Sequence, residues 1–473
     1  MIPLSLATIA QITHGTRHGG ARDAVVTGPV LIDSRAAEPG ALFAAVRGER
    51  ADGHDYAAAA VAAGAVGALV ERPVAGGVPA VVVDDVVAAL GRLARGVVDR
   101  LPELTTVGIT GSSGKTSTKD LLAQLTARLG PTVAPVGSFN NEIGHPLTVL
   151  RADAGTRYLV LETSARGVGH IAYLTRIAPP RIGVVLNVGS AHIGEFGSRD
   201  VVARAKGELV ESLTAHGTAV LNADDPLVRT MAARTAAKIV TFGRAPDATV
   251  RATGERLDER GRPRFSLVTP EGTQPVTLRL YGAHSVSNAL AAAATARELG
   301  LPPSEIAAAL SEATTVSRWR MEVGERADGV TVVNDAYNAN PESMRAALDA
   351  LRHMAHGRRS YAVLGGMAEL GAVSREEHEK IGRYAAESGV SGLVVIGEAA
   401  APVLAGAKQV GSWNGECVQV DDSAAAVAAL GGRLRPRDVV LVKGSRVAGL
   451  ERVAQALLDG EPAAGRHEGE AGA

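Results

Sequence analysis

One short stretch, TTVGITGSSGKTST at residues 105–118, constrains the fold of this chain more than any other. Branched and small apolar residues from Thr105 to Thr110 suit a buried strand, and the run DLLAQLTARL after the glycine turn is typical of an amphipathic helix. Strand, glycine turn, Lys-Thr and helix form the layout of a phosphate-binding loop. Glycines let backbone N–H groups converge on phosphate oxygens, and the helix N-terminus adds partial positive charge. The alternative is an ordinary glycine turn before a helix.

Two side chains of this loop have specific chemistry. Lys115 can reach the terminal phosphates of a nucleotide, and the Thr116 hydroxyl can ligate Mg²⁺. The strict pattern has Gly where this chain has Ile109, so the working pattern is the shorter T-G-x-x-G-K-T. The residues of this stretch predicted to bind ATP are Thr110, Gly111, Ser112, Ser113, Gly114, Lys115, Thr116 and Ser117.

Composition narrows the class of protein. A chain of 473 residues is too long for one core, so two or three domains are expected. A net charge of −1 provides no general attraction to nucleic acid or anionic membrane. The single cysteine, Cys417, excludes an internal disulfide and suits a reducing cytosol. With no apolar run of about 20 residues and no basic leader, we expect a cytoplasmic monomer that binds no nucleic acid and inserts in no membrane.

Strand and helix patterns alternate along most of the chain, which predicts an α/β protein of three domains. A small α/β domain is expected at 1–98, and a central phosphate-loop domain with a doubly wound sheet at 99–313. Residues 248–281 alternate polar and apolar side chains between turns and predict an antiparallel extension of that sheet. A second open, Rossmann-like sheet is expected at 314–459, and a disordered tail at 460–473.

Four features lie near predicted strand ends in the central domain, where open α/β sheets place ligands. Glu162 ends the strand RYLVLETS and is a natural Mg²⁺ ligand, unless it caps a helix. His192 follows a strand in a Gly-Ser-rich loop, which favours a site role over a structural one. Lys206 lies on a helix, where a lysine is normally solvated. His284 and Asn288 share one helix face, and Asn288 could read a base edge or cap the preceding loop.

The third domain adds candidates at the ends of its own strands. Asp335 ends a strand, where an acid often holds a ribose hydroxyl. Asn338 and Asn340 precede a helix, and turn chemistry alone would explain both. Arg320 could contact a transferring phosphate or pair with Glu322 on the surface.

With these residues in view, the chain resembles the Mur ligases of peptidoglycan synthesis over nearly its whole length, the C-terminal tail excepted. TGSSGKTS is similar to the family's ATP loop, and DSRAAEPGALFAAVRGERADGHDY to the block that holds the UDP-sugar. The remaining blocks follow in the family's order: NNEIGHPLTVL, ETSARGVGHI, NVGSAHIGEFGS, AKGE, NADD, GAHSVSNALAA, RWRMEV, NDAYNANP, LGGMAELG and VKGSR. In two places the chain departs from the common pattern, with Trp319 where the family usually has Gly and Gly366 where Asp is common.

The resemblance implies roles for individual residues. Lys115 would contact the β/γ-phosphates, and Lys206 matches a lysine that the family carries as a carbamate. Asn288 would lie by the adenine, Arg320 by the γ-phosphate and Asp335 by the ribose. The implied catalytic residues are Lys115, His192, Lys206 and Arg320, and the ligands of two Mg²⁺ ions are Thr116, Glu162, His192 and Lys206. The implied substrate contacts are Ser34 and Arg35 at the UDP end, with Asn140, Thr163, Ser164, Asn338 and Asn340.

Within the family, the block NDAYNANP and the absence of D-N-P-R favour the member that adds a dipeptide. The implied reaction is ATP-dependent ligation of D-alanyl-D-alanine to UDP-N-acetylmuramoyl-tripeptide through an acyl phosphate, the last cytoplasmic step in making the peptidoglycan precursor. Three alternatives remain. They are another amide ligase such as a folylpolyglutamate synthase, a phosphate-loop switch or binding protein, and a homologue that has lost catalysis.

Overall fold

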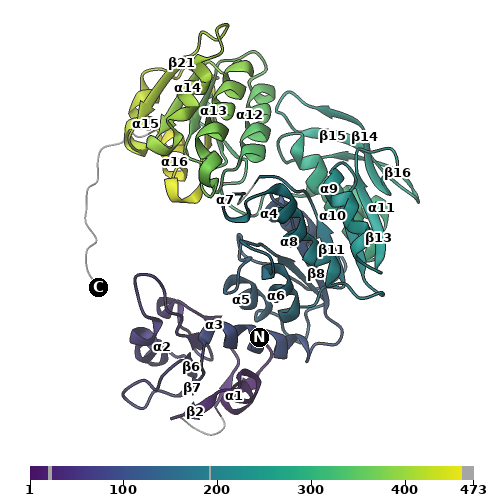
Figure 1. Ribbon diagram of the computed structural model, residues 1–473, viewed down its shortest axis with the longest axis vertical. Helices are drawn as coiled ribbons and strands as arrows, with labels where there is room; N and C mark the ends of the chain where they lie inside the picture. The colour runs from purple at the N-terminus through teal and green to yellow at the C-terminus, as the bar shows by residue number, and fades with distance from the viewer. Residues whose placement is uncertain (20–23, 191–192, 461–473) are drawn as a thin grey trace.

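The computed structural model describes residues 1–19, 24–190 and 193–460, and it forms three α/β domains along the chain (Figure 1). This confirms the predicted fold class. Apart from Gly460, the predicted tail lies outside the described residues. No helix of the described ranges is both long and apolar enough to cross a membrane.

The N-terminal domain is built on a five-stranded sheet that is parallel except at one edge. Its strands, in spatial order, are β2 (Thr16–His18), β7 (Ala80–Val82), β6 (Gly67–Val70), β5 (Leu42–Ala44) and β4 (Val30–Leu31). A two-stranded sheet pairs β1 (Leu4–Ser5) with β3 (Val25–Val26), and the helices are α1 (Leu6–Thr13), α2 (Ala57–Ala62) and α3 (Val86–Val98). Leu90 and Leu93 of α3 share a core with Leu159 and Leu174 of the central domain, so α3 joins the two domains.

The central domain holds a mixed sheet of nine strands. In spatial order they are β16 (Gly272–Thr277), β15 (Pro263–Thr269), β14 (Val250–Leu257), β13 (Lys238–Gly243), β12 (Thr218–Asn222), β11 (Ile182–Val185), β8 (Thr105–Thr110), β10 (Tyr158–Glu162) and β9 (Thr132–Val133). Strands β9 to β14 and β8 run parallel, and β14, β15 and β16 form the predicted antiparallel extension. Because β10 and β11 flank β8 on opposite sides, the chain changes direction across the sheet where the phosphate loop follows β8.

Helices cover both faces of this sheet, which makes it doubly wound. One core cluster joins the sheet to α4 (Lys115–Thr126), α10 (His284–Glu298) and α11 (Pro303–Glu312). The other joins it to α6 (His170–Ile177), α8 (Arg199–Glu211) and α9 (Pro226–Thr230). The short helices α5 (Gly144–Val149) and α7 (Ile193–Phe196) complete the domain.

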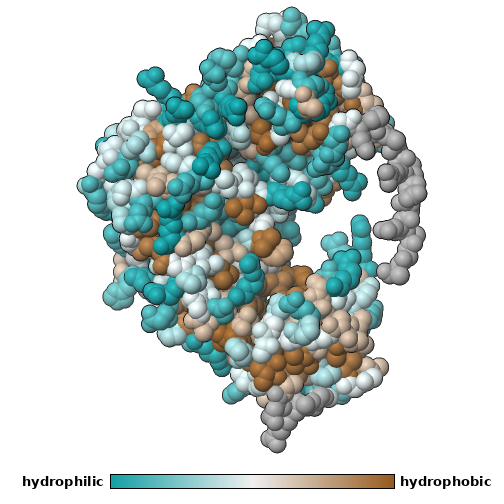
Figure 2. Space-filling view, turned by 180° about the vertical axis from the view of Figure 1, so that it is seen from behind, coloured by the Kyte–Doolittle hydropathy of each residue, from teal (hydrophilic) through white to brown (hydrophobic). Residues whose placement is uncertain are grey.

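The C-terminal domain is an open six-stranded sheet that is parallel except for its first strand. Its order is β17 (Glu322–Glu325), β18 (Thr331–Asn334), β22 (Val439–Lys443), β19 (Ser360–Leu364), β20 (Gly392–Ile396) and β21 (Glu416–Val420). One face packs on α12 (Pro341–Ala355), α13 (Ser374–Glu387) and α14 (Pro402–Lys408), and the other on α15 (Ser423–Gly431) and α16 (Glu451–Asp459). In the space-filling view, a wide hollow separates this domain from the N-terminal domain (Figure 2).

Candidate active site

The loop between β8 and α4 has the geometry of an anion cradle. The backbone N–H groups of Ser112 and Ser113 both donate to Asn187 Oδ1, each at 2.9 Å, so two amides converge on one acceptor. Gly114 has φ +82, and a Cβ there would lie 2.4 Å from Asn288 Oδ1, so both the conformation and the space require glycine. Lys115 opens α4 and donates to Gly111 O at 2.7 Å. The local structure therefore supports a phosphate-binding loop rather than an ordinary turn.

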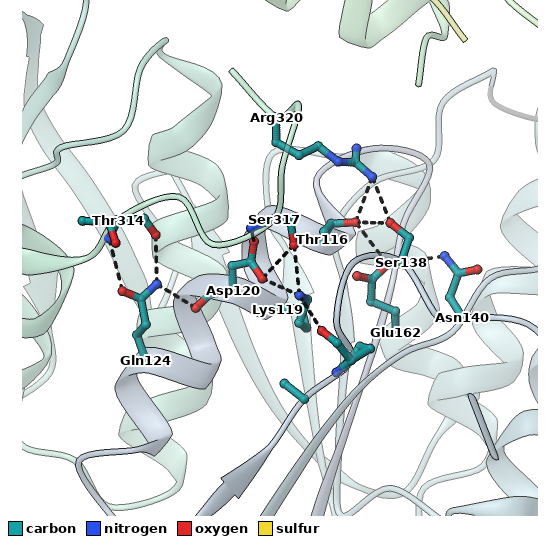
Figure 3. A network of polar contacts seen from close by, with 12 residues as sticks. Thr116, Lys119, Asp120, Gln124, Ser138, Asn140, Glu162, Thr314, Ser317 and Arg320 are labelled. Carbon is teal, nitrogen blue, oxygen red and sulfur yellow. Dashed lines mark hydrogen bonds and ion pairs between the residues drawn. The ribbon is translucent and has the colours of Figure 1, made fainter. Parts of the chain in front are cut away.

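Beside this loop, a polar cluster gathers around Thr116 (Figure 3). The Thr116 hydroxyl lies 2.8 Å from Ser138 Oγ and donates to Glu162 Oε2 at 3.3 Å. Arg320 Nη2, from the start of the C-terminal domain, donates to Thr116 Oγ1 and to Ser138 Oγ, each at 3.0 Å. Asn140 Nδ2 also donates to Glu162 Oε2, at 3.4 Å. Glu162 does not cap a helix, and Arg320 does not pair with Glu322, whose Oε2 accepts from the Trp319 N–H.

Glu162 is fully buried, and its second carboxylate oxygen, Oε1, has no hydrogen-bond partner among the described residues. Burial raises the pKa of the Glu162 carboxyl, while the nearby charges of Lys115 and Arg320 oppose this shift. A buried carboxylate oxygen without a donor, next to a threonine hydroxyl, is a donor set that suits a hard divalent cation. The described residues contain no group of three His, Cys, Asp or Glu that could hold a metal by themselves.

Lys206 lies on α8 and is only 4% exposed. The expectation of a solvated Lys206 is therefore wrong, because α8 turns this position toward the sheet instead of toward water. Burial is the main cause that lowers the pKa of the Lys206 ammonium well below its usual value, and the charge of Lys115 lowers it further. No described residue forms a hydrogen bond or ion pair with its amine. His192, predicted to act beside it, lies outside the described residues.

The C-terminal domain contributes a second set of side chains. Asp335 Oδ2 pairs with Lys443 Nζ at 2.6 Å, and Asp335 Oδ1 accepts from the Met321 N–H at 3.1 Å. Asn340 caps α12, as turn chemistry predicts, and also donates from Nδ2 to Ser112 O of the phosphate loop at 3.3 Å. The Arg320 guanidinium lies 4.1 Å from the centre of the Tyr337 ring, a cation–π contact. The two domains therefore meet at the loop itself.

A cavity of about 740 Å³ opens between the central and C-terminal domains at this point. The predicted site residues that line it are Ser112, Ser113, Gly114, Lys115, Thr116, Ser117, Asn140, Glu162, Ser164, Asn288, Arg320, Asp335, Asn338 and Asn340. Thr110, Gly111, Thr163 and Lys206 are buried and do not line it. Ser34 and Arg35 lie in a short helical turn of the N-terminal domain, where Arg35 is exposed and pairs with Asp33 at 2.8 Å.

The residues of the site that were not assigned from the sequence include Ser138, Asn187, Tyr337 and Lys443. These residues lie in or beside the sequence blocks that resemble the Mur ligases, and their place in those blocks is the signal that could have identified them. Asn187 bonds with Ser112, which is 75 residues away in the chain, and Lys443 bonds with Asp335, which is 108 residues away, so spacing alone could not assign either residue.

Comparison with known proteins finds Mur ligases that match nearly the whole chain. The chain matches the Mur ligase family catalytic domain at residues 29–97, the Mur ligase middle domain at 109–296 and the Mur ligase glutamate ligase domain at 319–446. A UDP-N-acetylmuramoyl-tripeptide–D-alanyl-D-alanine ligase of Mycobacterium tuberculosis H37Rv is 51% identical, over 97% of this chain and 98% of the relative. The ligase of the same name from Escherichia coli K12 is 35% identical over 97% of this chain and 99% of that relative.

Solved structures are similar over the same span. A crystal structure of MurF from Acinetobacter baumannii has a TM-score of 0.87 and 33% identity, over 97% of this chain and 99% of that one. The MurF ligase of Thermotoga maritima, solved in complex with ADP, has a TM-score of 0.79 and 31% identity, over 92% of this chain and 98% of that one.

Proposed function

The chain belongs to the Mur ligase family, and from this premise we propose that it joins D-alanyl-D-alanine to UDP-N-acetylmuramoyl-tripeptide with the consumption of ATP. The chemistry is that of an ATP-dependent amide-bond ligase. The observation that carries the substrate assignment is identity of 51% over 97% of the chain to a ligase of that name. Among the alternatives, a folylpolyglutamate synthase and a switch protein do not account for a match that includes the N-terminal domain.

The geometry supports phosphoryl transfer to a carboxylate. ATP would phosphorylate the terminal carboxylate of the tripeptide, and the amino group of D-alanyl-D-alanine would attack the acyl phosphate and release phosphate. Lys115 belongs to the loop and Arg320 reaches Thr116 from the start of the C-terminal domain, so together they are placed to neutralise charge on a transferring phosphoryl group. Asn288 would lie by the adenine and Asp335 by the ribose. The side chains of Asn140, Ser164, Asn338 and Asn340, with buried Thr163, would orient the reacting carboxylate and amine.

Thr116 and Glu162 would hold Mg²⁺, with His192 and a modified Lys206 completing two ion sites. The unpartnered Oε1 of Glu162 and the adjoining Thr116 hydroxyl support this assignment. When bound, the ions screen phosphate charge. Mg²⁺ needs only one or two carboxylates when phosphate oxygens and waters supply the other ligands.

Replacement of Glu162 by glutamine should raise the Mg²⁺ concentration for half-maximal ligation by about 10- to 100-fold. The substitution keeps the shape of the side chain but removes the charge that attracts the cation. Initial rates across a MgCl₂ series check this, together with the Mg²⁺-dependent rise in Tm in the presence of ADP. Glu271→Gln, which removes a surface carboxylate paired with Arg297, is the matched control. Identical Mg²⁺ dependence in both variants would exclude Glu162 as a ligand.

We also propose that Lys206 acts as a carbamate. Its lowered pKa favours the neutral amine, which is the form that attacks CO₂. The neutral amine nitrogen would form a bond to the carbon of CO₂ as one C–O π bond opens, one proton would leave to solvent, and the neutral amine would become an anionic carbamate beside the Mg²⁺ ligands. The 4% exposure of Lys206 supports this, because a buried ammonium is unfavourable.

The N-terminal domain would hold the UDP end of the substrate through Ser34 and Arg35. A hollow lies between the N-terminal domain, which carries both residues, and the C-terminal domain (Figure 2), and in this proposal a long substrate would extend from the N-terminal domain to the phosphate loop. We place the protein in the cytoplasm as a monomer that binds neither nucleic acid nor membrane.

The decisive experiment measures phosphate release with UDP-N-acetylmuramoyl-tripeptide, with and without D-alanyl-D-alanine. Release should require the nucleotide-linked peptide and should increase when the dipeptide is added, because the acyl phosphate turns over only when an amine attacks it. Detection of the UDP-linked pentapeptide by mass spectrometry confirms the product. Equal ATP hydrolysis with neither, one or both substrates would favour a phosphate-loop switch instead, and absence of turnover would favour a homologue without catalysis.

A further inference from the structure

Helix α4 does more than begin at the phosphate loop, because its polar face binds the linker between the central and C-terminal domains. This linker comprises residues 313–321. Gln124 donates to Thr314 O and accepts from the Thr314 N–H, both at 3.1 Å (Figure 3). One turn closer to the loop, Asp120 accepts from the Ser317 N–H at 2.9 Å and from Ser317 Oγ at 3.1 Å. The linker is thus held at two points along one helix.

A buried ion pair forms the centre of this network. Lys119, only 2% exposed, pairs with Asp120 and also donates to Pro135 O at 3.0 Å and to Ser317 Oγ at 3.3 Å. Pro135 lies three residues before Ser138, and Ser317 lies three residues before Arg320. The pair therefore joins the two segments whose side chains meet at Thr116.

The backbone on both sides of Arg320 is strained. Trp319 has φ 60 and Met321 has φ 50, in the left-handed region that favours glycine. Such residues persist only where surrounding contacts determine their conformation. The C-terminal domain supplies one anchor, since the Tyr337 N–H donates to Trp319 O at 3.3 Å and the Met321 N–H donates to Asp335. The other anchor is α4, so Arg320 is held between two domains.

We propose that Lys119, Asp120 and Gln124 are positioning residues that fix Arg320 against Thr116 through the linker. This inference rests on the proposed function, in which Arg320 contacts the transferring phosphoryl group. The helix that starts at the nucleotide loop would also determine the position of Arg320 in the linker to the neighbouring domain. Phosphoryl transfer depends on such placement, because misplacement by about 1 Å is enough to reduce rates by about 100-fold.

Ser317→Ala tests the proposal with little risk to folding, because the Lys119–Asp120 pair and the Ser317 N–H contact remain. The variant should lower kcat about tenfold and leave the KM for ATP within about twofold, since the arginine is displaced while the phosphate loop is intact. Gln124→Ala should act in the same direction. Arg128→Ala is the matched control, because Arg128 follows α4 and its side chain pairs with Glu312, which precedes the linker, rather than with a linker residue.

A double-mutant cycle separates positioning from general stability. In an Arg320→Ala background, Ser317→Ala should produce no further loss of kcat, although any change in Tm should persist. An equal fractional loss of kcat with and without Arg320 would overturn the proposal, and so would wild-type kcat in both Ser317→Ala and Gln124→Ala.

A second readout does not depend on ligation. Trp319 becomes the only tryptophan when Trp413 is replaced by phenylalanine, so its fluorescence reports on the linker. Ser317→Ala in this background should increase quenching of Trp319 by acrylamide, whereas Arg128→Ala should not. Unchanged quenching would refute the anchoring of the linker by α4. If the unsubstituted chain fails to ligate, the proposed function fails, and this measurement still decides whether α4 holds the linker.

Discussion

Lys115→Ala is expected to lower kcat for ligation by about three powers of ten while the protein remains folded. Lys115 is the first residue of α4 and lies directly after the glycine turn, so we expect its ammonium to contact the terminal phosphates. Burial lowers the pKa of Lys115, while the carboxylate of Glu162 opposes this shift. A contact made chiefly in the transition state affects kcat more than substrate binding.

Steady-state rates and thermal melting together check this expectation. Lys238→Ala is the matched control, because the exposed Lys238 belongs to the same domain but pairs with Glu298 and does not line the cavity. The control should retain the rate of the unsubstituted chain. Near-normal turnover in Lys115→Ala with unchanged Tm would contradict the proposed role of the phosphate loop in catalysis.

Lys206→Ala is expected to be nearly inactive, and short carboxylates such as acetate should partly restore its activity. If the lysine acts as a carbamate, its removal leaves a small cavity without the anion beside the Mg²⁺ ligands. A small carboxylate that enters this cavity supplies both the charge and the oxygen atoms. A neutral additive of similar size, such as acetamide, should not restore activity, because it lacks the charge.

Arg204→Ala provides the control for Lys206, since Arg204 lies two residues earlier on the same helix and is exposed. Its activity should be normal and insensitive to acetate. Incubation of the unsubstituted chain with ¹³C-bicarbonate should produce a carbamate carbonyl resonance that Lys206→Ala lacks. Full activity of Lys206→Ala, or a carbamate resonance that persists in that variant, would refute the proposal.

The departure at Trp319 shows how the structure explains a feature that the sequence only records. Mur ligases commonly have glycine at this position. Trp319 has φ 60, a backbone conformation that glycine adopts without strain. Here the indole ring is stacked near Tyr337, with ring centres 6.5 Å apart, and Arg446 lies 4.3 Å from its centre. These contacts help to hold a conformation that tryptophan rarely adopts.

The sequence alone was sufficient for features that depend on local order. The strand β8, the glycine turn and α4 follow from hydrophobic period and glycine placement within residues 105–126, and the alternation of strands and helices predicted the open sheets. Asn340 as a helix cap is likewise local, because its partner Ser343 is three residues away. Such features need no knowledge of distant segments.

Only the tertiary structure decided which distant side chains meet. Arg320 contacts Thr116 across 204 residues of chain, and Ser317 contacts Asp120 across 197. The sequence predicted that Lys206 is a surface lysine. A helical pattern shows which residues share a face of the helix, but not which face the rest of the protein covers. Burial, and with it the lowered pKa of this amine, arises from the packing of whole elements, which no local pattern encodes.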